Sequence, residues 1–230
     1  MSLPARFLGV LTSPRTTFQN VSVHPRWFGM LAVTTILVAF FAAAPMTTEA
    51  GRQAAIDQQV NAMKSFGMNV TPEVQDRLEA RAGIMPYTTG ISVLVMGPIM
   101  ALIVSAILFA VFNAGLGGEA SFKQLFAVQT HAGVVSCVSA VFSGAINYFR
   151  GGTGSVANVA ALLPMIDEQS FVGHLLGTID VFLIWWVLAM AIGLGVLYRR
   201  RTQPIAITLF GLYAVIALVI AVIKSRAGGA

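Results

Sequence analysis

One acidic side chain, Asp180, stands inside an apolar run that is long enough to cross a lipid bilayer. A charge at membrane depth is costly, so such residues usually face the interior of a helix bundle and have a polar partner. Asn147, Tyr148 and Arg150 end another apolar run at a similar expected depth. We therefore expect Asp180 to meet Arg150 or Tyr148, either as a tie that fixes helix register or as an ion or proton site. A shallow position wetted by headgroup water is the third interpretation.

The remaining polar motifs are weak signals for a cofactor or a catalytic centre. Asp167 and Glu168 with His174 could ligate a metal, but their spacing fits no known metal site. The glycine-rich stretch 150–155 lacks the lysine that follows the glycines of a phosphate-binding loop. The single cysteine, Cys137, lies in an apolar run, which leaves no partner for a disulfide within one chain. The sequence therefore predicts no cofactor, no metal and no enzymatic activity.

Small residues recur at every fourth position of one apolar run, at Ala132, Ser136, Ala140 and Gly144. Residues four apart lie on the same side of a helix, and small side chains let two membrane helices approach closely. This pattern predicts a smooth helix-packing face. Packing within the chain is the default interpretation, and self-association through this face is the alternative.

Five apolar runs must position these residues. Crossing the hydrocarbon core takes about 20 helical residues, and the runs cover 27–44, 91–112, 126–146, 175–198 and 205–223. The composition agrees, because 57% of the residues are hydrophobic and only 10% are charged, against about 25% charged in soluble domains. The predicted fold class is all-α, a polytopic membrane protein with a bundle of five transmembrane helices, and residues 1–230 form one domain.

Basic residues at the ends of these runs predict the orientation in the membrane. Arg15 and Arg26 precede the first run, and Arg199, Arg200 and Arg201 fill the loop between the fourth and fifth runs. Four spans separate the two clusters, so both lie on one side. We expect a multi-pass protein of the bacterial inner (cytoplasmic) membrane, with a cytoplasmic N-terminus and the C-terminus outside. Contact of these arginines with anionic headgroups explains the net charge of +5 better than nucleic-acid binding, which we do not expect.

Three segments outside the runs have patterns of their own. Residues 1–26 predict a cytoplasmic interfacial helix, with Pro14 at a first helical position. Residues 46–87 predict an outer loop of two short helices, the second of which opens at Pro72. Residues 155–165 are apolar but too short to span, which favours a re-entrant or interfacial piece.

Several stretches along nearly the whole chain resemble the bacterial branch of the Yip1 family; only the loop 46–87 falls outside the resemblance. The stretches are FLGVLTSPR at 7–15, HPRW at 24–27, GGEASFKQ at 117–124, NYxRG at 147–151, LPMIDE at 163–168, IDxxxIWW at 179–186 and YRRRT at 198–202. The resemblance implies a five-helix integral membrane fold with a cytosolic N-terminus. It also implies relatives in eukaryotes that act in membrane traffic and interact with Rab-type GTPases or with one another. Because this chain has only 26 residues before its first run, it lacks their long cytosolic region, and we do not expect GTPase binding.

Two functions are compatible with these observations. The first is a non-enzymatic membrane scaffold or adaptor that organises other membrane proteins or lipid, with the bilayer, other membrane proteins or further copies of itself as partners. The second is a small transporter, channel or lipid-translocating protein that uses the intramembrane Asp180. The environment of Asp180 in a structure discriminates between them.

Overall fold

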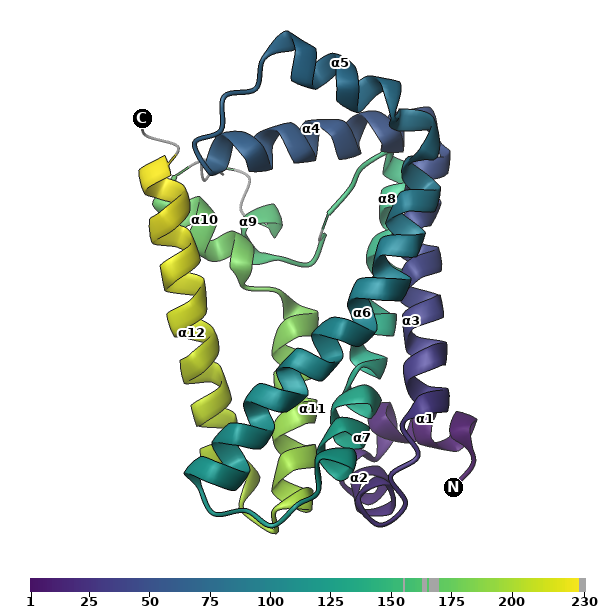
Figure 1. Ribbon diagram of the computed structural model, residues 1–230, viewed down its shortest axis with the longest axis vertical. Helices are drawn as coiled ribbons and strands as arrows, with labels where there is room; N and C mark the ends of the chain where they lie inside the picture. The colour runs from purple at the N-terminus through teal and green to yellow at the C-terminus, as the bar shows by residue number, and fades with distance from the viewer. Residues whose placement is uncertain (155, 163–164, 166–169, 228–230) are drawn as a thin grey trace. The chain divides into compact units, whose positions relative to one another are not determined.

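The computed structural model describes residues 1–154, 156–162, 165 and 170–227, and Figure 1 shows its helices in chain order. Within these residues the regular secondary structure is helical, apart from one isolated β-bridge between Asn158 and Asp180. It divides into two compact units, each made of three separate stretches. Unit 1 comprises Met1–Ala39, Ile91–Ser139 and Ile184–Phe210, and unit 2 comprises Phe40–Gly90, Ala140–Leu183 and Gly211–Ala230.

The described residues contain four helical stretches that are long and apolar enough to cross a membrane, namely Phe28–Thr47, Ala82–Gly115, Phe122–Arg150 and Thr202–Ile223. Their main helices are α3 (Phe28–Ala43), α6 (Met85–Phe109), α8 (Val134–Arg150) and α12 (Thr202–Ala227). The predicted run 175–198 corresponds instead to α11 (Val181–Leu197), which is apolar but has 17 residues. The all-helical membrane class is therefore confirmed, while the count of five spans stays a prediction.

Two of the predicted runs are not single helices. The run 126–146 falls on α7 (Phe122–Ala132) and α8, which separate at Gly133. The run 175–198 contains the end of α10 (Phe171–Thr178) and the whole of α11, with Ile179 extended between them. The prediction that Asp180 lies well inside a helix is therefore wrong, because it lies in this break. A short carboxylate side chain competes for backbone N–H groups, which favours a helix start over a helix interior.

In unit 1, the two N-terminal helices α1 (Leu3–Thr12) and α2 (Pro14–Val23) pack against each other and against α7. α2 begins at Pro14, as the sequence predicts, because proline has no N–H to lose at a first helical position. Its apolar residues Phe18 and Val21 are fully buried. Protein covers the face that was expected to meet the bilayer surface, and the interfacial position stays a prediction.

The residues of the predicted outer loop form two helices in unit 2, α4 (Glu49–Ser65) and α5 (Pro72–Ala80), flanked by the short turns η1 (Ala44–Thr47) and η2 (Ala82–Ile84). α4 ends before Gly67, whose φ of 72° is a left-handed conformation that glycine adopts without strain. The second helix opens at Pro72, as predicted. In the segment 155–165 the structure has the short helix α9 (Val159–Leu162); Ser155 and residues 163–164 lie outside the described residues, and a re-entrant path stays a prediction.

Candidate functional site

Asp180 caps the N-terminus of α11. Its Oδ1 accepts hydrogen bonds from the backbone N–H groups of Phe182 at 2.8 Å and Leu183 at 3.2 Å. These are the second and third residues of the helix, which are the donors that a capping side chain satisfies. The carboxylate is half-buried. Capping of the α11 N-terminus therefore accounts for an acidic residue at this position.

The chain on either side of Asp180 pairs with the segment before α9. The N–H of Val159 donates to the carbonyl of Ile179 at 2.9 Å, and the N–H of Val181 donates to the carbonyl of Ala157 at 3.2 Å. A broken helix frees backbone groups that lipid cannot satisfy, so they need partners inside the protein. This short antiparallel bridge supplies such partners for the break between α10 and α11.

The three residues that the sequence offers as partners of Asp180 have different environments at the end of α8. Asn147 is buried, and its Nδ2 donates to the carbonyl of Gly154 at 2.8 Å. Tyr148 is 44% exposed, and Arg150 is exposed. Asn147 thus closes the turn after α8, whereas contact of Asp180 with Arg150 or Tyr148 stays a prediction.

The four small residues are not equally placed. A Cβ atom on Gly144 would lie 2.5 Å from the carbonyl oxygen of Phe41, so α8 and α3 approach closely at this point of unit 2. Ala132 is buried at the end of α7, Ala140 is half-buried, and Ser136 is exposed. Ala132 is the last residue of α7, whereas the other three lie on α8. Close packing is therefore found at Gly144, and a role of the whole set in packing or self-association stays a prediction.

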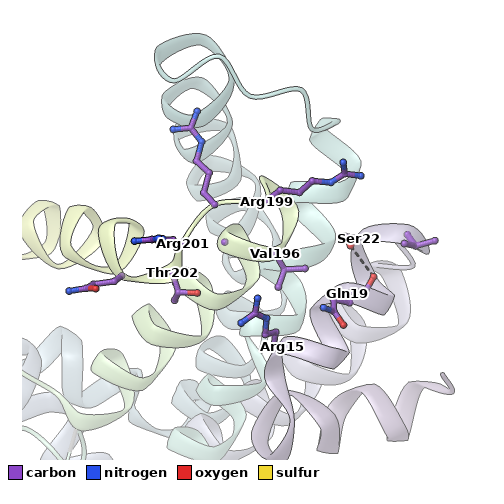
Figure 2. A pocket seen from close by; sticks show the side chains of 11 residues that line it. Arg15, Gln19, Ser22, Val196, Arg199, Arg201 and Thr202 are labelled. Carbon is purple, nitrogen blue, oxygen red and sulfur yellow. Dashed lines mark hydrogen bonds between the residues drawn. The ribbon is translucent and has the colours of Figure 1, made fainter.

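A basic groove with a volume of about 830 Å³ opens in unit 1 between α2 and the loop that joins α11 to α12. Figure 2 shows Arg15, Gln19 and Ser22 on the α2 side and Arg199, Arg201 and Thr202 on the other side. Arg200 and Gln203 also line the groove, whereas Arg26 does not. Four of the five arginines that the sequence assigns to headgroup contact are thus brought together.

The groove carries positive charge without an acidic residue among its described lining. By sequence, unit 1 contains seven Lys and Arg residues and one acidic residue, Glu119. Glu119 lines a neighbouring cavity with Arg199 and Arg200. α12 also begins at Thr202, and the free N–H groups of a helix start favour an anion. The groove is therefore suited to an anionic partner.

The loop that holds these arginines is fixed by specific contacts. Arg199 has a φ of 52°, a left-handed conformation that is uncommon for a residue with a side chain. The Arg200 side chain donates from Nη2 to the carbonyl of Leu116 at 2.8 Å, and its backbone N–H donates to the carbonyl of Gly195 at 2.9 Å. The arginines thus project from an ordered turn.

Tyr198 and Asn113 form a polar contact that sequence reasoning missed. The Tyr198 hydroxyl donates to Asn113 Oδ1 at 2.6 Å, and Asn113 Nδ2 donates to the carbonyl of Ala120 at 2.7 Å. The Tyr198 ring stacks on Phe112 with a centroid distance of 5.2 Å, and Gly118 leaves room for it. Asn113 lies in η3 (Ala110–Gly115), a π-helical turn of a kind that is rare and frequently functional. The sequence does contain one signal for this contact, because Asn113 is an isolated polar residue directly after the apolar run 91–112.

Comparisons with known proteins agree with this architecture. The family model described as the Yip1 domain matches residues 8–223. The chain is also similar to the membrane protein YknW of Bacillus subtilis (strain 168), with 22% identity over 224 residues that cover 96% of this chain and 91% of the relative. No solved structure shows a significant match.

Proposed function

Because the chain belongs to the Yip1 family and is an integral membrane protein, we propose that it is a non-enzymatic scaffold or adaptor that organises membrane proteins or lipid. The observation that carries this proposal is the basic groove of unit 1, in which Arg15 from α2 meets Arg199, Arg200 and Arg201 from the loop before α12. A set of exposed cations without an acidic lining residue is suited to docking an anionic surface.

The proposed orientation puts this groove on the cytoplasmic side, with the C-terminus outside, in the bacterial inner membrane. The support is the positive-inside rule, since the groove collects the arginines of two short segments that flank the predicted spans. On that side the groove would meet anionic lipid headgroups and the acidic cytoplasmic segments of other membrane proteins. Rim charges of this kind contribute to selectivity and to association rate more than to affinity.

The experiment is cross-linking mass spectrometry on native membranes. It compares the wild-type chain with a variant in which Arg15 and Arg200 are replaced, Arg15→Gln with Arg200→Gln. The matched control is Arg77→Gln with Arg81→Gln, which removes the same charge from α5 and its end. A scaffold that docks through the groove loses its cross-links at α2 and the 198–201 loop only in the first variant. The same partners at the same yield in all three proteins would overturn the proposal.

One observation favours the second candidate, a transporter or channel. Interrupted helices occur at membrane depth where backbone lines a cavity or a pathway, and the break between α10 and α11 holds the half-buried Asp180. In that case Asp180→Asn would abolish proton or ion flux into vesicles that contain the purified chain. Flux that is absent from the wild type, or unchanged in the variant, would exclude this role of Asp180.

A further inference from the structure

A further cavity in unit 1, separate from the basic groove and from the cavity lined by Glu119, has a volume of about 230 Å³ and lies where the start of α1 meets α3 and α7. Its lining has four polar side chains, Ser2, Arg6, Arg26 and His131, and its apolar lining includes Leu3 and Met30. The two most buried polar side chains of this lining each have a nitrogen atom without a hydrogen-bond partner among the described residues. Such orphaned buried atoms are rare in folded proteins and require an explanation.

Arg6 is the first of these side chains. It is 5% exposed, and its Nη1 donates to the carbonyl of His24 at 3.3 Å, while its Nε has no partner in the described part of the chain. Burial and the neighbouring Arg26 lower the pKa of Arg6 from its ordinary value, although arginine keeps its charge in proteins. The one acidic residue of unit 1, Glu119, lines a different cavity. A buried guanidinium without a counter-ion is costly, so the cavity is suited to an external anion.

His131 is the second buried side chain with an unpartnered nitrogen among the described residues. It is fully buried on α7, and its Nδ1 lies 2.7 Å from the carbonyl oxygen of Ala127. A carbonyl only accepts, so this contact assigns the proton of the neutral ring to Nδ1. Nε2 is then an acceptor, and it has no partner in the described residues. A ligand that satisfies both orphaned nitrogens would bring a donor for His131 Nε2 and a negative charge for Arg6.

We propose that this cavity binds a phosphate group that carries a hydroxyl donor, as in the phosphoglycerol headgroup of an anionic lipid or in free hydrogen phosphate. Phosphate oxygens accept from Arg6 and Arg26, which is the pairing that guanidinium groups favour. The hydroxyl donates to His131 Nε2. A phosphocholine headgroup has no donor, and the ammonium of phosphoethanolamine would lie beside two guanidinium groups. This site does not depend on the scaffold role, because it shares no lining residue with the basic groove.

The first experiment is native mass spectrometry of the full chain in detergent with equal amounts of phosphatidylglycerol and phosphatidylcholine. We expect the wild type to retain one phosphatidylglycerol. Arg26 is exposed at the rim, so Arg26→Gln leaves the fold intact and lowers this retention about tenfold, as expected for a lost hydrogen bond to a charged group. The control Arg81→Gln removes the same charge from an exposed position after α5 and retains the lipid. Equal retention of the two lipids by the wild type, or a loss in Arg81→Gln but not in Arg26→Gln, would overturn the site.

The second experiment tests the hydroxyl donor. Phosphatidylmethanol has the same phosphodiester charge as phosphatidylglycerol but no hydroxyl group. The wild type is expected to prefer phosphatidylglycerol, and His131→Leu is expected to bind both lipids equally while keeping its preference for either over phosphatidylcholine. A preference for phosphatidylglycerol that persists in His131→Leu would contradict the role of Nε2.

A third arm separates the two sources of phosphate. Inorganic phosphate is added to the delipidated chain, and thermal unfolding is compared between the wild type and Arg26→Gln. Stabilisation by phosphate in the wild type only, without retained phosphatidylglycerol, assigns the site to free phosphate. Retained phosphatidylglycerol that added phosphate does not displace assigns it to the lipid. Neither retention of the lipid nor stabilisation by phosphate in the wild type would overturn the proposal.

Discussion

Asp180 shows how one side chain can secure an interrupted membrane helix. Its carboxylate accepts from two N–H groups at the start of α11, and the chain around it pairs with the segment before α9. We expect Asp180→Ala to lower the free energy of unfolding by about 0.5–2 kcal/mol, the usual cost of a lost N-cap. Asp180→Asn keeps an acceptor oxygen and should stay close to the wild type. Thermal unfolding of the purified proteins in one detergent checks this order, and equal losses in the two variants would contradict the capping role.

Gly144 gives a second prediction for a single residue. A side chain there meets the backbone of Phe41, whereas Ser136 on the same helix is exposed. Gly144→Leu is expected to lower the free energy of unfolding by about 1–3 kcal/mol through overpacking. Ser136→Leu adds the same kind of bulk without a clash and serves as the matched control. The relevant measurement is the midpoint of unfolding in detergent, and two equal midpoints would exclude close packing at Gly144.

At the scale of elements, Gln124 connects two helices of unit 1. Its Oε1 accepts from the backbone of Ser121, which closes the capping box at the start of α7, and its Nε2 donates to the carbonyl of Ser22 on α2 at 2.9 Å. Gln124→Glu keeps the acceptor and loses the donor, while Gln124→Ala loses both. We expect hydrogen exchange of the α2 amides to quicken in both variants and stability to fall by about 1 kcal/mol more in Gln124→Ala. Unchanged exchange in α2 would show that this contact does not hold the helix.

The elements also show which features hydropathy can predict. The run 27–44 matches α3 closely, and Pro14 and Pro72 mark the helix starts, because lipid solubility and proline geometry act locally. The break at Ile179 lies between only two polar residues, Thr178 and Asp180, in an otherwise apolar run, so the mean hydropathy of the run does not reveal it. Arg6 and His131 line the same cavity although they are far apart in sequence. A pattern of local residue spacing cannot predict such a contact.

At the scale of the whole molecule, charge is unevenly divided. By sequence, unit 1 has seven basic residues and one acidic residue, whereas unit 2 has seven basic and eight acidic residues. Because the two units have the same number of basic residues, the difference lies in the acidic residues, which contribute little to the positive-inside rule. The difference gives unit 1 a net positive charge, which suits this unit to anionic partners.

The orientation can be measured with introduced cysteines. In a Cys137→Ser background, Thr12→Cys lies at the end of α1 and Asn69→Cys lies between α4 and α5; both positions are exposed. We expect an impermeant maleimide to label Asn69→Cys on intact spheroplasts and to label Thr12→Cys only after the membrane is opened. The reverse pattern would place the N-terminus outside and contradict the orientation.

The packing of α1 and α2 on α7 has a consequence for biosynthesis. Phe18 and Val21 lie near the start of the chain, but α7, against which their helix packs, begins only at Phe122. A ribosome must therefore add about a hundred residues, enough for two membrane spans, before the protein itself can cover that apolar face. During this interval the bilayer surface is the apolar environment within reach, so the N-terminal helices are expected to rest on the membrane first and transfer onto the protein when α7 emerges.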